Sequence, residues 1–102
     1  MAFSIMLDAC VLFPAPLRDF LLTLAETDLF RAKWTEQIHD EWSRNLLLRR
    51  PNLEPERLIR TRQTMNNFFP DALIEGYEYL IPSLTLPDPD DRHVLAAAIR
   101  DR

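Results

Sequence analysis

Along the chain, short apolar runs alternate with longer stretches in which apolar residues have helical spacing. Residues 3–7 read FSIML, a nearly continuous apolar run that ends at Asp8. Such a run predicts a strand buried on both faces, as in a parallel sheet. Residues 29–35, LFRAKWT, predict a second strand.

The helical stretches follow these two runs. Residues 14–26, PAPLRDFLLTLAE, predict a helix that begins near its prolines. Thr35 is a favoured N-cap for a helix through about Leu48, and another helix is expected from about Pro55 to about Phe68. Residues 72–75 are ambiguous between a strand and a helical turn, with Gly76 as a break. The alternation predicts an α/β layer fold with a central parallel sheet.

The last stretch, DPDDRHVLAAAIR at residues 88–100, predicts a helix preceded by three aspartates. Asp88 suits the N-cap, and carboxylates suit the positive end of the helix dipole. Asp91 heads an expected core-facing stripe, where a carboxylate is costly unless it is paired or metal-bound. Capping and chemistry therefore both remain open for these aspartates. The chain stops where an α/β unit would enter its next strand, so we expect it to be incomplete. The predicted stripe consists of Val94, Leu95, Ala98 and Ile99.

The length and composition of the chain are those of one small domain. It has 102 residues, of which 47% are hydrophobic, enough for a core. The net charge of -4 is mild, and by itself it proposes no nucleic-acid or membrane partner. The charge is nevertheless uneven, because residues 44–62 hold six arginines against two glutamates, a balance of +4 that leaves -8 elsewhere.

The single cysteine, Cys10, cannot form an internal disulfide, which favours a reducing, cytoplasmic location. We expect Cys10 to be a small buried residue. No signal peptide or membrane span is predicted. His39 and His93 lie in different predicted helices without cysteine support, so they are expected to be surface or capping histidines and not zinc ligands.

Three acidic residues are candidates for one shared site. Asp8 ends the first predicted strand, Glu41 lies along the apolar face of the helix after Thr35, and Asp91 begins the last helix. Taken singly, each has a structural alternative: Asp8 as a turn aspartate, Glu41 as a solvent-facing edge residue and Asp91 as a helix cap. Sites of open α/β sheets form at the carboxyl ends of the strands, so together the three predict a cluster there.

Clustered carboxylates repel one another and would be protonated or hold a cation. Oxygen ligands without cysteine favour Mg2+ or Mn2+ over zinc. Such an ion supports hydrolysis of a phosphodiester bond, because it activates water and neutralises charge on the phosphate. Arg44, Arg57 and Arg60 are candidates for phosphate contacts, or else belong to a solvated helix face.

Three segments resemble PIN-domain ribonucleases, in particular the VapC-like toxins of bacterial toxin–antitoxin pairs. They are IMLDACVL near the N-terminus, HDEW on the helix after Thr35, and LPDPDDRHVLAAAIR near the end, of which DPDDRHVLAAA is the most specific. The resemblance implies a three-layer α/β/α fold and a ribonuclease that cuts single-stranded RNA with Mg2+ or Mn2+. It implies Asp8, Glu41 and Asp91 as metal ligands, with Asp88 at a further acidic or capping position.

The resemblance also implies partner proteins, and the sequence differs from the family after its last predicted helix. The family's toxins commonly dimerise and are silenced by an antitoxin that covers the site. PIN domains continue after the helix of Asp91 into another strand beside the first one, so residues 1–102 correspond to the N-terminal part of the domain. Without that strand, residues 3–7 would present an unpaired edge. The alternative to an enzyme is therefore an inactive, truncated PIN-like module that binds an antitoxin or another partner protein.

Overall fold

The fold is described by a computed structural model of residues 3–101. Five α-helices, two strands and two 3-10 helices follow one another in this part of the chain. In chain order they are β1 (Phe3–Met6), α1 (Ala9–Leu12), α2 (Ala15–Glu26), β2 (Phe30–Lys33), α3 (Glu36–Arg49), α4 (Pro55–Phe68), η1 (Glu78–Ser83), η2 (Pro89–Asp91) and α5 (Arg92–Asp101).

β1 and β2 form a parallel two-stranded sheet, with Phe3 paired to Phe30 at one end of the register. A single parallel bridge joins Trp34 to Leu73 just beyond β2, which resolves the ambiguity of residues 72–75 in favour of an extended segment. The parallel sheet confirms the predicted α/β class. Within residues 3–101 no strand pairs with the other edge of β1. The expected burial of both faces is wrong at the start of this strand, because no described element covers Phe3, which is 68% exposed.

The predicted starts of the helices near Pro14, Thr35 and Pro55 are confirmed, whereas Pro89–Asp91 form the 3-10 helix η2 and α5 begins at Arg92. The Thr35 hydroxyl accepts a hydrogen bond from the backbone N–H of Ile38 at 3.0 Å and caps α3. α4 begins at Pro55, and α2 has Pro14 as its N-cap and Pro16 in its first turn, where the missing N–H costs nothing. Gly76 adopts a positive φ of 73°, a conformation that glycine reaches without strain, and it turns the chain toward η1.

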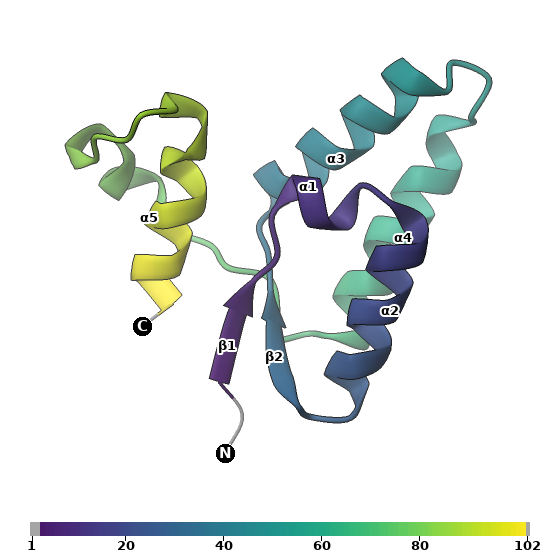
Figure 1. Ribbon diagram of the computed structural model, residues 1–102, viewed down its shortest axis with the longest axis horizontal. Helices are drawn as coiled ribbons and strands as arrows, with labels where there is room; N and C mark the ends of the chain where they lie inside the picture. The colour runs from purple at the N-terminus through teal and green to yellow at the C-terminus, as the bar shows by residue number, and fades with distance from the viewer. Residues whose placement is uncertain (1–2, 102) are drawn as a thin grey trace.

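Figure 1 shows α2, α3 and α4 on one side of the sheet, and α5 with η1 on the other. α5 runs antiparallel to β1, so its first turn lies on the side where the strands end (Figure 1). The largest fully buried side chains of the main core are Trp34 and Trp42, which lie among Leu12 and Ile38. A second, smaller cluster unites η1 and α5.

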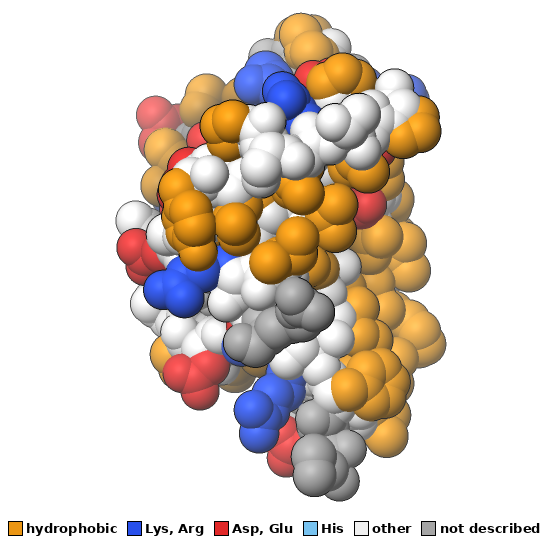
Figure 2. Space-filling model, turned by 90° about the vertical axis from the view of Figure 1, so that its left-hand side faces the viewer, with side chains coloured by type: hydrophobic (Ala, Val, Ile, Leu, Met, Phe, Trp, Pro, Cys, Tyr) orange, Lys and Arg blue, Asp and Glu red, His pale blue; other side chains and the backbone are white. Residues whose placement is uncertain are grey.

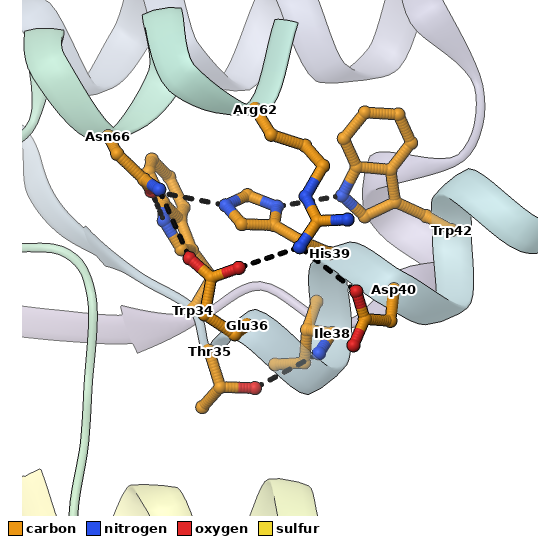
Figure 3. A network of polar contacts seen from close by, with 9 residues as sticks. All are labelled: Trp34, Thr35, Glu36, Ile38, His39, Asp40, Trp42, Arg62 and Asn66. Carbon is orange, nitrogen blue, oxygen red and sulfur yellow. Dashed lines mark hydrogen bonds and ion pairs between the residues drawn. The ribbon is translucent and has the colours of Figure 1, made fainter. Parts of the chain in front are cut away.

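His39 is fully buried beside both tryptophans, which corrects the expectation of a surface histidine. Trp42 Nε1 donates to His39 Nδ1 at 3.0 Å, and Trp34 Nε1 donates to Asn66 Oδ1 at 2.8 Å (Figure 3). His39 Nε2 lies 3.1 Å from the same Asn66 oxygen. Because Nδ1 accepts a hydrogen bond, the neutral ring carries its proton on Nε2 and donates it to Asn66. Burial lowers the pKa of His39, which favours this neutral form.

An ion-pair network covers the rim of this buried group. Arg62 Nη2 lies 2.6 Å from Glu36 Oε2 and 2.9 Å from Asp40 Oδ1, so α4 is tied to the first turn of α3 (Figure 3). Asn66 Nδ2 also donates to Glu36 Oε1 at 3.3 Å. The nitrogens of His39 and the amide of Asn66 are therefore paired from the buried ring out to the surface, whereas the buried Ser43 hydroxyl of α3 has no hydrogen-bond partner among residues 3–101.

The buried face of α5 differs from the prediction. His93, Ala96 and Ala97 are buried, whereas the apolar residues of the predicted stripe are only partly buried. Two small alanines pack with Tyr77 in the second cluster, whereas the predicted stripe stays partly exposed and its Val94 packs against the main core. Cys10 is exposed and not buried, because the short α1 turns Leu12 toward the core and Cys10 away from it.

Candidate functional site

A polar pocket of about 380 Å3 lies between α3 and the segment that begins α5. The strands end on this side of the sheet, since α3 follows β2 almost directly and the first turn of α5 lies at the same level (Figure 1). Its α3 wall arises from residues spaced three and four apart, which share one helix face. The pocket is lined by Gln37, Asp40, Glu41, Arg44, Ile81, Pro89, Asp90, Arg92 and His93.

Glu41 is held in this pocket by His93. Its Oε1 lies 2.9 Å from His93 Nε2, and the histidine side chain is only 5% exposed. The other ring nitrogen, Nδ1, is buried and has no hydrogen-bond partner among the residues that the structure describes. One carboxylate oxygen is thus fixed by the ring, which orients the second oxygen of a side chain that is 26% exposed.

The other predicted acidic residues lie in local structural contacts. Asp8 is half-buried and caps α1, with Oδ1 accepting from the Val11 N–H at 3.2 Å. Asp88 caps η2 in the same way, accepting from the Asp90 N–H at 2.9 Å. Asp91 ends η2 and is exposed. Asp8 therefore bonds to nearby backbone, as its alternative of a turn aspartate implies, and Asp88 follows the capping alternative.

The structure brings Glu41 and Asp90 to one pocket, while Asp8, Asp88 and Asp91 do not line it. Across residues 3–101, no three His, Cys, Asp or Glu side chains lie close enough together to hold a metal ion. The carboxylates suit Mg2+ or Mn2+ by type, but as they stand they do not form a coordination site. The centre of Asp8, Glu41 and Asp91 stays a prediction.

The predicted arginines separate between two surfaces. Arg44 lines the pocket with Glu41, and Arg57 lines grooves near the turn between α3 and α4. Arg60 is exposed on α4. The pocket instead gains Arg92, whose Nε donates to the Pro89 carbonyl at 3.1 Å. Two cations thus line a pocket that also holds carboxylates, an arrangement that can bind a phosphate and orient a polar group beside it.

Sequence reasoning missed His93, Arg92 and Asp90 as members of this pocket. The available signal was the spacing of Asp90, His93 and Ala97, which lie three and four residues apart on one helix face. That face looked mixed, because it combines an acid, a histidine and an alanine. Its small residue is what allows the face to pack closely.

Comparison with known proteins adds no relative. The chain matches no protein-family model, no curated protein and no solved structure. Within residues 3–101, every helix is too short or too polar to span a membrane.

Proposed function

We propose that this chain is a PIN-type, metal-dependent endoribonuclease domain, the toxin of a toxin–antitoxin pair, which hydrolyses phosphodiester bonds of RNA. The proposal includes the three-layer α/β/α arrangement, with helices on both sides of a parallel sheet. The observation that carries it is the pocket at the carboxyl end of the strands, in which His93 holds Glu41 beside two arginines. Open α/β sheets bind their ligands at this end.

In this proposal, different residues of the pocket contact different groups of the RNA. Arg44 and Arg92 offer guanidinium groups that suit the oxygens of one phosphate. The free oxygen of Glu41 is placed to accept a hydrogen bond from a polar hydrogen beside that phosphate, because His93 fixes the opposite oxygen. The requirement for Mg2+ or Mn2+ belongs to the proposal as a property to be measured.

The test is cleavage of a fluorophore-quencher single-stranded RNA by the purified chain with Mg2+, Mn2+ or EDTA. We expect cleavage that needs the ion and falls by about a hundredfold or more in Glu41→Gln. Glu75→Gln, the same change at an exposed position outside the pocket, is the matched control and should cleave like the wild type. Cleavage that survives both EDTA and Glu41→Gln would show that the activity has another origin.

A second candidate is an inactive PIN-like module that binds an antitoxin or another partner protein. It is favoured by the local contacts of Asp8 and Asp88 and by the apolar side chains gathered over the face of α5 and η1 (Figure 2). Co-purification with the product of a neighbouring small reading frame, together with absent metal-dependent cleavage, would favour this module over the enzyme. Light scattering of the chain alone would reveal the homodimer that the resemblance implies.

A further inference from the structure

Two adjoining grooves open where α3 passes into α4, each with a volume of about 520–530 Å3. They share Arg49, Arg50, Leu53 and Arg57, so they form one continuous hollow, which we call the arginine groove. The pocket of Glu41 shares no lining residue with either groove. The arginine groove is thus separate from the pocket of Glu41.

The arginine groove carries positive charge that the described chain does not neutralise. Arg18, Arg49, Arg50 and Arg57 line it, and none of them lies within 4.0 Å of a carboxylate among residues 3–101. Arg18 donates to the Leu12 carbonyl at 2.9 Å and stacks on Trp42 at 4.8 Å. Burial lowers the pKa of Arg18 by more than the neighbouring Asp19 carboxylate raises it.

The floor of the arginine groove is apolar. Its aliphatic residues come from the end of α3, the turn and the start of α4, and Phe13 adds an aromatic ring at the end of α1. The Arg49 guanidinium lies 5.6 Å from the centre of that ring and covers it. The groove therefore combines an aliphatic floor with a cationic rim. The aliphatic residues are Leu46, Leu53 and Leu58.

We propose that the arginine groove binds an acidic peptide segment of a partner protein, whose apolar side chains enter the floor and whose carboxylates meet the arginines. Charge complementarity favours this occupant, since four arginines face a single lining acid, Glu54. The floor argues against a nucleic acid, because base binding needs open aromatic faces and the one aromatic ring is covered by Arg49. The chain as a whole is also negative, at -4, which disfavours a long polyanion but not a short segment bound locally.

The probe is a short fluorescein-labelled peptide with leucine and phenylalanine at helical spacing and glutamate elsewhere, followed by anisotropy. We expect saturable binding that weakens as NaCl rises from about 50 mM to about 300 mM. The double variant Arg49→Glu/Arg50→Glu should raise the Kd by about tenfold or more. Arg31→Glu, an exposed arginine on β2 outside the groove, is the matched control and should bind like the wild type.

Further probes separate the groove from general attraction between opposite charges. A peptide with every leucine and phenylalanine replaced by serine keeps its charge and should lose binding, because nothing fills the apolar floor. Equal weakening by Arg31→Glu and by the groove variant would overturn the proposal, as would retained binding of the serine peptide. Tighter, groove-dependent binding of an oligouridine than of the acidic peptide would also overturn it, in favour of a nucleic-acid surface. Circular dichroism of each variant verifies folding.

Discussion

Two segments of the chain, β1 to α4 and η1 to α5, have hydrophobic cores of different composition. The first builds its core from large side chains, including Trp34 and Trp42, and pairs the buried polar atoms of His39 with Asn66 and Trp42. The second buries Tyr77 with two alanines and leaves larger apolar residues half-exposed. Since burial of apolar area is the main stabilising term, we expect the first segment to be the more stable one.

Polar links join the two segments. Tyr77 OH donates to Gln37 Oε1 at 3.2 Å, and His93 binds Glu41 at 2.9 Å. Lys33 Nζ lies 3.7 Å from Asp101 Oδ1, at the limit of an ion pair. The candidate pocket lies at this junction, so its geometry depends on how firmly the weaker segment is held.

The largest expected effect comes from the core of the first segment. Trp42→Ala removes a fully buried ring together with the donor to His39, and we expect a loss of about 3–5 kcal/mol in the free energy of unfolding. Urea denaturation measures this loss. Tyr79→Ala, which removes an aromatic ring that is 72% exposed, should change stability by less than about 0.5 kcal/mol. Similar losses in the two variants would contradict the core described here.

A smaller effect is expected at the shared acceptor of the first segment. Asn66→Ala leaves Trp34 Nε1 and His39 Nε2 without their partner, which should cost about 2 kcal/mol. Asn67→Ala changes an exposed neighbour on the same helix and is the matched control. If both alanine variants unfold at the same urea concentration, the hydrogen bonds of Asn66 contribute nothing to stability.

Lowering the pH should reduce the free energy of unfolding by less than Asn66→Ala does, because both nitrogens of His39 stay in place. The pKa of His39 is lowered in the folded chain by burial, so below its usual value near 6.5 the unfolded chain binds the proton more readily. This contribution to stability is complete above about pH 6.5 and is lost as the pH falls toward the folded pKa. Denaturation at several pH values should show a steeper loss for the wild type than for His39→Gln. Parallel curves would exclude His39 as the cause.

The junction should respond to a change at His93. His93→Ala removes the ring that holds Glu41, and we expect a loss of about 1–2 kcal/mol, seen chiefly as faster amide exchange in α5. His93→Gln, whose amide nitrogen can approach the place of Nε2, should restore part of the protection. Exchange that increases equally in α3 and α5 would mean that the two segments unfold together.

The smallest effect is expected at the surface network. Glu36 and Asp40 are 53% and 60% exposed, so Arg62→Ala should cost less than about 1 kcal/mol. Raising the salt concentration should reduce the difference between this variant and the wild type. A loss as large as that of Asn66→Ala would show that the ion pairs stabilise the chain more than solvent-exposed pairs usually do.

The same contrast explains how much of the fold could be predicted from the sequence. In the first segment, caps and prolines define the helix starts, and Thr35 and Pro55 begin helices where expected. In the second, the inward face of α5 was predicted from apolar residues at helical spacing from Asp91, whereas His93 and two alanines face inward. Helical periodicity alone cannot decide between two faces when small apolar residues lie on both.

The candidate site was predictable only in part for the same reason. Glu41 could be singled out because a charged residue on an apolar helix face is unusual. Its partner His93 lies 52 positions along the chain, and no local pattern links the two. Asp8 combined the signals of a turn aspartate and of a ligand, and Asp88 those of a cap and of a ligand. Only three-dimensional contacts show that each caps a helix.

The arrangement around His39 has a consequence for spectroscopy. Both tryptophans of the chain lie against this one imidazole, with ring centres 5.6 Å and 5.9 Å from it. We therefore expect intrinsic indole emission to report locally on the first segment and to change when His39 is protonated. We expect the same emission to respond far less to melting of α5, so a single fluorescence transition would describe mainly the first segment.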